Sequence, residues 1–173
     1  MGKYIIDANV VLLAGTPVKD IPSDQLLCAQ KCIKFINNFV TKADNILVLD
    51  AEGRIMKEYR GLYSLDRAPN IATVFYRWAC RNVPQNAEDF ISLKEIAENE
   101  FESYPDSEQL KQFDPPDRKY IALAFQHKEH PPIVEASDSK WWGIREEMER
   151  CGLNIRFIDE TYIKEKYAQK MGH

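Results

Sequence analysis

The sequence predicts one α/β domain whose parallel sheet is covered by helices on both faces. Short runs of branched apolar residues, each bounded by polar residues or proline, recur along the chain, and helical patterns lie between them. Strands that alternate with helices form parallel crossover units, which place helices on the faces of the sheet. The predicted strands cover residues 4–6, 46–49, 133–137 and 155–158.

The clearest helical pattern lies between the first two predicted strands. From Leu26 to Val40 apolar residues recur every three or four positions, which is typical of a helix with one buried face. Ser23 or Asp24, placed after Pro22, supplies the expected N-cap. The remaining patterns predict helices over residues 51–62, 70–80, 88–101, 116–128, 139–151 and 161–171.

The middle of the chain has a different character. From residue 62 to residue 113 no strand pattern is found, and helix-like segments with aromatic side chains predominate. The segment is too apolar to be a linker, and no Gly/Ser-rich stretch marks a domain boundary. We interpret residues 62–113 as a helical insertion within a single domain that spans residues 1–173.

The composition is that of an ordinary globular domain, with 45% hydrophobic and 29% charged residues in 173. No apolar stretch approaches the roughly 20 residues of a membrane-spanning helix, and the N-terminus enters a strand pattern without a basic leader. The four cysteines lack the dense spacing of a secreted disulfide scaffold. We therefore expect a cytoplasmic protein without a membrane partner.

The formal net charge of −4 argues against a protein that binds nucleic acid by a basic surface alone. A nucleic-acid enzyme of this charge needs local compensation, and bound Mg²⁺ or Mn²⁺ supplies it because the ion reverses the sign of an acidic pocket. Basic residues expected near such a pocket are Arg54, Lys57, Arg60, Arg118, Lys119 and Lys140.

Four carboxylates, Asp7, Glu58, Asp117 and Asp138, occupy places from which they are expected to converge. Asp7 ends the first predicted strand, Asp138 comes at the end of another, and Asp117 opens a helix. Ligands of open parallel sheets bind outside the carboxyl ends of the strands. Crowded carboxylates are tolerated mainly where a cation or proton neutralises them, so the set predicts a divalent-metal site.

Each acid also has a purely structural explanation. Asp7 fits a turn residue, and Glu58 fits a solvated ion pair with Arg54 one helical turn away. Asp117 and Asp138 fit the first turn of a helix. The conjunction of the acids, and no single one of them, favours the metal site.

The motifs around these acids resemble those of PIN-domain ribonucleases. The sequence has IIDANV at residues 5–10, Glu58 in the helix after the second predicted strand, DRKYIALA at residues 117–124 and SDSKW at residues 137–141. The order and structural places match the four acidic motifs of that family. The resemblance extends from residue 4 to about residue 159.

The resemblance implies a Rossmann-like three-layer α/β/α fold with a short parallel sheet, and an endoribonuclease that hydrolyses RNA phosphodiester bonds by two-metal activation of water. Asp7, Glu58, Asp117 and Asp138 would be both catalytic residues and ligands of Mg²⁺ or Mn²⁺. Asn9 and Ser137 would orient them. Many members are toxins of toxin-antitoxin pairs, so the aromatic insertion fits an internal core, a homodimer face or an antitoxin groove.

Two departures from the family pattern keep alternatives open. Lys140 stands where several relatives have an acid or Asn, and the stretch between Glu58 and Asp117 is longer than in compact toxins. Both favour the alternative of a catalytically inactive PIN-like module that binds protein or RNA. The second acid is also open, because Asp50, Glu52 and Glu58 lie in the same region.

Overall fold

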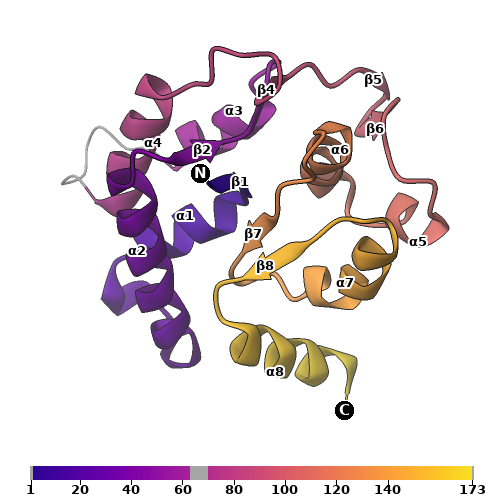
Figure 1. The fold of residues 1–173 in the computed structure, drawn as a ribbon. Coiled ribbons are helices and arrows are strands. Elements are labelled where there is room, and N and C mark those ends of the chain that lie inside the picture. Colours follow the sequence, from indigo (N-terminus) through magenta and orange to yellow (C-terminus); the bar gives the residue numbers. More distant parts are fainter. Residues whose placement is uncertain (1, 63–69, 173) are drawn as a thin grey trace.

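The computed structural model describes residues 2–62 and 70–172 and shows a mixed α/β fold. Its main sheet has four strands in the order β2-β1-β7-β8, and each neighbouring pair is parallel. Helices flank this sheet, as the sequence predicted (Figure 1). The four strands are β1 (Gly2–Ile6), β2 (Asn45–Leu47), β7 (Ile133–Glu135) and β8 (Ile155–Phe157).

Figure 1 shows one group of helices to the left of these strands and another to their right. The left group is α1 (Ala8–Gly15), α2 (Leu26–Thr41) and α4 (Ile71–Arg81). The right group is α6 (Arg118–Gln126) and α7 (Lys140–Arg150). The arrangement is compatible with a three-layer α/β/α fold. The other helices are α3 (Arg54–Gly61), α5 (Glu108–Lys111) and α8 (Glu160–Met171).

The helix α1 was not predicted from the sequence. Its residues are almost all apolar, so no polar face marks helical periodicity, and a short apolar run does not distinguish a strand from a buried helix. In the structure α1 packs against α2 and α4, which covers it on more than one side. At its end Gly15 is required, because a Cβ there would lie 2.6 Å from the Cβ of Ala72 at the start of α4.

The helix predicted over residues 88–101 is wrong. Three short strands lie there: β4 (Phe90–Ile91), β5 (Glu95–Ala97) and β6 (Glu100–Phe101). Ile91 and Leu93 are buried whereas Ser92 and Lys94 are exposed, so burial has the period of a strand and not that of a helix. The interpretation of residues 62–113 as a helical insertion is therefore wrong for residues 88–101. It is right for α4 and α5, which are helical. Residues 63–69 lie outside the described residues.

The second predicted strand is divided in two. β3 (Leu49–Asp50) follows β2 after one residue, Val48, whose N–H still bonds to Tyr4 O at 2.9 Å. β3 then pairs with β4 in parallel. Part of the supposed insertion thus supplies a strand beside the region that carries the second acid.

The aromatic side chains of α4 contribute to the core. Phe75 is fully buried and contacts Tyr59 edge-on, with ring centroids 5.1 Å apart. Trp78 contacts Phe39 of α2, with centroids 5.2 Å apart. The aromatic residues of the insertion were expected to form an internal core, a homodimer face or an antitoxin groove. Phe75 and Trp78 belong to the internal core.

Two helix starts differ from the prediction. Residues Ser23–Gln25 form a short 3-10 helix, and the N-cap of α2 is Gln25, which makes no side-chain cap bond. The helix α3 begins at Arg54, three residues later than expected, because Gly53 adopts a left-handed conformation with φ 73°. The carboxylate of Asp50 then accepts hydrogen bonds from the N–H groups of Arg54 and Ile55, at 2.7 and 3.0 Å.

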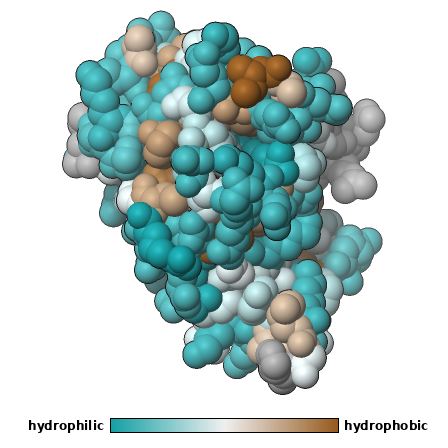
Figure 2. Space-filling model, turned by 90° about the vertical axis from the view of Figure 1, so that its right-hand side faces the viewer, coloured by the Kyte–Doolittle hydropathy of each residue, from teal (hydrophilic) through white to brown (hydrophobic). Residues whose placement is uncertain are grey.

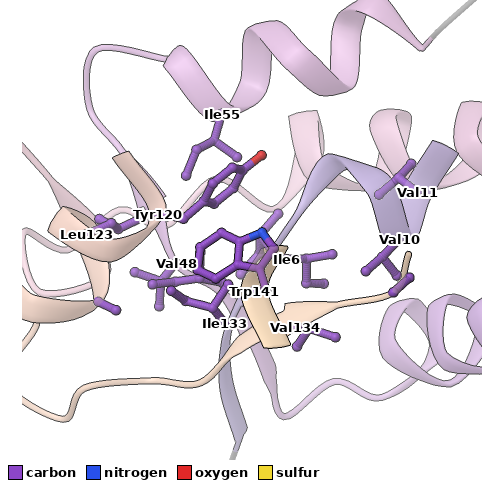
Figure 3. Packing of buried hydrophobic residues seen from close by; sticks show 14 of the residues in the cluster. Ile6, Val10, Val11, Val48, Ile55, Tyr120, Leu123, Ile133, Val134 and Trp141 are labelled. Atoms are coloured by element: carbon purple, nitrogen blue, oxygen red, sulfur yellow. The ribbon is translucent and has the colours of Figure 1, made fainter. Parts of the chain in front are cut away.

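The core between the sheet and α6 and α7 contains large aromatic residues. Trp141 is fully buried and packs edge-on against Phe113 and Tyr120, with centroids 4.8 and 6.4 Å away. Figure 3 shows Trp141 and Tyr120 among aliphatic side chains from β1 and β7. The face drawn in Figure 2 is mainly hydrophilic, with hydrophobic residues only in small groups. Within the described residues, no helix is long and apolar enough to cross a membrane.

We expect Phe75→Ala to lower the free energy of unfolding by about 3–5 kcal/mol, because it leaves a cavity among close-packed rings. The matched control is Val74→Ala on the same helix, where the side chain is 46% exposed and the change should stay within roughly 0.5 kcal/mol. Urea denaturation measures both. Equal losses in the two variants would contradict the assignment of Phe75 to the core.

Candidate functional site

Two of the predicted acids, Asp7 and Asp138, and one further acid, Glu135, lie at the carboxyl edge of the two central strands. Asp7 directly follows β1, Glu135 is the last residue of β7, and Asp138 comes three residues later. The chain runs from β1 to β2 on one side, whereas β7 lies on the other side of β1. This is a topological switch point, where open parallel sheets usually bind ligands.

Asp7 is buried, with only 3% of its surface exposed. Its Oδ1 accepts a hydrogen bond from Asn9 N at 2.8 Å and so caps α1, whereas its Oδ2 is buried and accepts no bond from an N–H group. Burial raises the pKa of Asp7 to about 6; hydrogen bonds with Asn9 N and with the Glu135 carboxyl oppose the shift, and the charge of Glu58 adds to it. The turn explanation therefore accounts for one carboxylate oxygen and not for the other.

Glu135 is a site residue that the sequence analysis missed. It is fully buried, and its Oε1 accepts hydrogen bonds from Ser137 N at 3.0 Å and Asp138 N at 2.9 Å. Its Oε2 is buried and accepts no bond from an N–H group, and the carboxyl groups of Glu135 and Asp7 are close enough to hydrogen-bond with each other when one of them is protonated. Burial and the charge of Asp7 raise its pKa well above the usual range. A glutamate inside the apolar run 133–136 was the available signal, because charged residues are rarely fully buried.

Asp117 lies in the first turn of the short 3-10 helix that leads into α6, as the helix-turn explanation predicted, but its side chain makes no cap bond. Burial raises its pKa to about 7, and the charges of Asp7 and Asp138 add to the shift. Asp138 itself accepts a bond from Lys140 N at 3.0 Å, close to the start of α7. The position of Asp138 at the start of a helix therefore explains the hydrogen bond of one of its carboxylate oxygens.

Glu58 reaches the cluster from α3. Its carboxylate pairs with Lys119 Nζ at 2.6 Å and accepts a hydrogen bond from the hydroxyl of Tyr120. The same hydroxyl accepts a bond from Ala8 N at 3.2 Å, next to Asp7. The ion pair expected between Glu58 and Arg54 is absent from the described ion pairs, in which Arg54 binds Glu52 and Glu95.

The geometry distinguishes among the three acids considered for the second motif. Asp50 is fully buried and its two oxygens bind the start of α3. Glu52 accepts bonds from Ser92 Oγ at 2.6 Å and Leu93 N at 3.0 Å, away from Asp7. Glu58 alone of these three is among the causes that shift the pKa of Asp7. The structure thus brings Asp7, Glu58, Asp117 and Asp138 together, with Glu135 added.

The supporting residues are near the cluster. Asn9 and Ser137 both line a cavity of about 210 Å³ beside α1. Ser137 O accepts a bond from Lys166 Nζ at 2.7 Å, which fixes the loop after β7. Lys140 pairs with Asp114, an acid that also raises the pKa of Asp117.

Half of the basic rim expected from the sequence is paired with carboxylates. Lys119 and Lys140 pair with acids of the cluster region, and Arg54 pairs with Glu52 and Glu95. Arg118 donates from Nε to Phe113 O at 2.9 Å, which leaves its charge in place. Lys119 and Lys140, which follow Asp117 and Asp138 closely in sequence, are therefore already engaged by carboxylates.

The carboxylate oxygens of the cluster are of the kind that binds a hard divalent cation. Their positions in this structure do not form a complete metal site. Carboxylates are suitable ligands for Mg²⁺ and Mn²⁺, and Asp7 Oδ2 and Glu135 Oε2 are buried oxygens that accept no bond from an N–H group. Among residues 2–62 and 70–172, however, no group of three or more His, Cys, Asp or Glu side chains is placed to hold a metal ion. The ion pair between Lys119 and Glu58 is one reason, because an ammonium group already binds that carboxylate.

Comparison of the chain with models of protein families, with curated proteins and with solved structures gave no match. The resemblance to PIN domains therefore rests on the sequence motifs alone.

The raised pKa values of Asp7 and Asp117 predict how stability depends on pH without metal. Both carboxyls bind protons more tightly in the folded state, with pKa values of about 6 and about 7 against 3.8. Their contribution to stability is therefore lost as the pH rises from about 4 to about 7. The amide in Asp117→Asn does not titrate, so this variant should gain stability over wild type as the pH rises through that window.

Urea denaturation of wild type, Asp7→Asn and Asp117→Asn at several pH values measures this. The exposed Asp44→Asn substitution is the control for a change of one charge. A constant difference between Asp117→Asn and wild type across the window would contradict the proposed burial of an uncompensated carboxylate.

Glu135 should be required for its acceptor oxygen more than for its charge. Glu135→Ala leaves two part-buried N–H groups without their acceptor and should cost about 1–3 kcal/mol. Glu135→Gln retains an oxygen acceptor and removes a negative charge beside Asp7, so its stability at neutral pH should equal or exceed that of wild type. Thermal unfolding of both variants tests this, and a loss in Glu135→Gln as large as that in Glu135→Ala would contradict it.

Proposed function

We propose that the protein is a metal-dependent endoribonuclease with a PIN-like, three-layer α/β/α fold. The observation that carries the proposal is the convergence of Asp7, Asp117 and Asp138 at the switch point of the sheet, where the charges of Asp7 and Asp138 raise the pKa of Asp117. Perturbed carboxyls that share a sheet edge are typical of functional sites. Crowded carboxylates destabilise the metal-free protein. Their presence therefore favours a function that needs several carboxylates in one place.

A bound Mg²⁺ or Mn²⁺ would neutralise these carboxylates and supply an activated water for hydrolysis of a phosphodiester. Asp7 and Asp117 are the residues proposed to hold it. Mg²⁺ keeps several of its waters and is often bound through one or two carboxylates, so a complete three-carboxylate group is not a requirement.

The other residues of the cluster would fix these ligands. Glu135 binds the N–H groups of Ser137 and Asp138 and thereby sets the position of the Asp138 loop. Tyr120 links Glu58 to Ala8 N, so it connects α6, α3 and the start of α1. Side chains held in this way lose little rotamer freedom when a substrate binds.

The second candidate is a non-catalytic PIN-like module that binds RNA or protein. The ion pair between Lys119 and Glu58 favours it, because the protein itself supplies a cation to the cluster. Lys140 likewise supplies a cation near Asp117, because it pairs with Asp114, one of the acids that raise the pKa of Asp117. The two candidates differ in whether the cluster binds a divalent ion.

Binding of Mn²⁺ should raise the thermal stability of wild type. At about 100 times Kd the ion adds about 2.7 kcal/mol, which corresponds to a Tm increase of roughly 5–10 °C for a chain of this size. Asp7→Asn should be at least as stable without metal and gain little with it, whereas the exposed control Asp44→Asn should gain as much as wild type. No shift in wild type, together with a less stable Asp7→Asn, would favour the non-catalytic module.

Cleavage of a fluorescent single-stranded RNA tests the activity directly. Wild type should cut the RNA with Mn²⁺ and stop when EDTA is added, and Asp117→Asn should lose more than roughly 100-fold in rate. Asp44→Asn, purified in the same way, should retain the rate of wild type; loss of cleavage in Asp117→Asn but not in Asp44→Asn would exclude a contaminating nuclease. Metal binding without cleavage of RNA would leave the cluster a metal site and overturn the endoribonuclease assignment.

A further inference from the structure

A basic and aromatic cavity lies between α2 and β8, outside the acidic cluster. Its volume is about 310 Å³. Figure 1 shows α2 on one side of the strands, with β8 at the edge of the main sheet. We call this cavity the α2–β8 groove; it is lined by Tyr4, Lys31, Lys34, Phe35, Asn38, Phe39, Lys42, Asn45, Arg156, Phe157 and Ile158.

The groove has an excess of positive charge in a protein of net charge −4. Four of its lining residues are Lys or Arg, and none is Asp or Glu. Lys31 pairs with Asp159 at 2.8 Å. Lys34, Lys42 and Arg156 form no ion pair with any carboxylate that the structure describes. These three cations contrast with the rim of the acidic cluster, where Lys119 and Lys140 are neutralised.

Aromatic rings are interleaved with these cations. The guanidinium of Arg156 lies 5.3 Å from the ring centroid of Phe35 and 5.7 Å from that of Tyr4. Phe35 also stacks on Phe39, with centroids 6.0 Å apart and planes at 27°. Phe35 is only partly buried, so its ring is available to a ligand. Rings beside unpaired cations are the pattern with which proteins bind single-stranded nucleic acid.

The groove lies beside the strand that ends at Glu135. Ile158, which lines the groove, donates its N–H to Glu135 O at 2.9 Å, and Phe157 pairs in register with Glu135. From Lys31 to Lys42 the lining residues follow α2 for roughly 17 Å, at 1.5 Å per helical residue. The groove is therefore next to a backbone segment that carries one acid of the cluster.

We propose that the α2–β8 groove binds a segment of single-stranded RNA, with its phosphates at Lys34, Lys42 and Arg156 and a base against Phe35. This inference rests on the proposed function and names how the substrate is held. The acidic cluster repels phosphate, so a separate cationic surface is needed to bind the RNA. A cavity of this size accepts a base but not a helix, which favours RNA over a folded protein partner.

Binding of a fluorescein-labelled oligouridylate of about 12 nucleotides, a length within the range that single-strand binding proteins cover, tests the proposal by anisotropy in EDTA. The variant Lys34→Ala/Lys42→Ala/Arg156→Ala should bind at least about 10-fold more weakly. The slope of log K against log salt should become shallower by about 2, at about 0.7 per phosphate contact in a single strand. The conservative Phe35→Leu should weaken binding by about 5-fold or more, because stacking is lost while apolar volume is kept.

The matched control removes the same charge elsewhere. Lys19→Ala/Lys164→Ala/Lys170→Ala changes three exposed lysines that form no ion pair in the described part of the chain, and it should bind as wild type does. Equal losses in the two triple variants, or no loss in either, would overturn the proposal. Equal competition by poly-glutamate would also overturn it, since that outcome indicates general attraction of anions. The double variant Lys34→Ala/Lys42→Ala, which keeps Arg156 on its rings, repeats the test if the triple variant does not fold.

The groove and the proposed activity are tested separately. Loss of RNA binding in the groove variants, with no cleavage by any form, would support the groove and reject the nuclease. Unchanged binding in the groove variants, with cleavage that depends on Asp117, would reject the groove and keep the nuclease.

Discussion

Negative charge buried between the two central strands is the constraint on which the rest of the site depends. Asp7 and Glu135 stand at the ends of β1 and β7; each has one buried oxygen that accepts no N–H bond, and the two carboxyls hydrogen-bond with each other when one of them is protonated. Burial of like charges is costly, and the raised pKa values of both residues express that cost. The other oxygen of each residue binds backbone N–H groups, at the start of α1 and in the Asp138 loop. The same carboxylates therefore hold local structure together and leave charge for a ligand.

Compensation of this charge is divided between two parts of the molecule. At the cluster, Lys119 and Lys140 pair with Glu58 and Asp114, so these two cations are occupied. At the α2–β8 groove, Lys34, Lys42 and Arg156 form no ion pair in the described chain, and Arg156 lies beside aromatic rings. This separation gives a physical basis for the proposed activity of an acidic protein on an acidic polymer. The groove would supply attraction, and a divalent ion would reverse the sign of the cluster.

The site depends on contacts between segments distant in the chain. Glu58 comes from α3, Tyr120 from α6 and Ala8 from α1, and one phenolic hydroxyl connects them. Because Tyr120 is fully buried beside Trp141, the packing of α7 also determines where this hydroxyl lies. A change in the core near Trp141 would thus be transmitted to the acids by direct contact.

The sequence by itself determined the parallel α/β class, the four strands of the main sheet and the places of Asp7, Asp117 and Asp138, because strand and helix patterns recur locally. It did not reveal α1 or the strands within residues 88–101. An apolar run such as α1 has no polar face to show its period, and the two-residue strand β4 depends on pairing with β3. Only the tertiary structure shows that Glu58 acts on Asp7, whereas Asp50 and Glu52 bind other groups. Only the tertiary structure reveals the α2–β8 groove and Glu135 as a member of the cluster. These features depend on distances between residues that are far apart in the chain. Local patterns of hydrophobicity and charge carry no information about such distances.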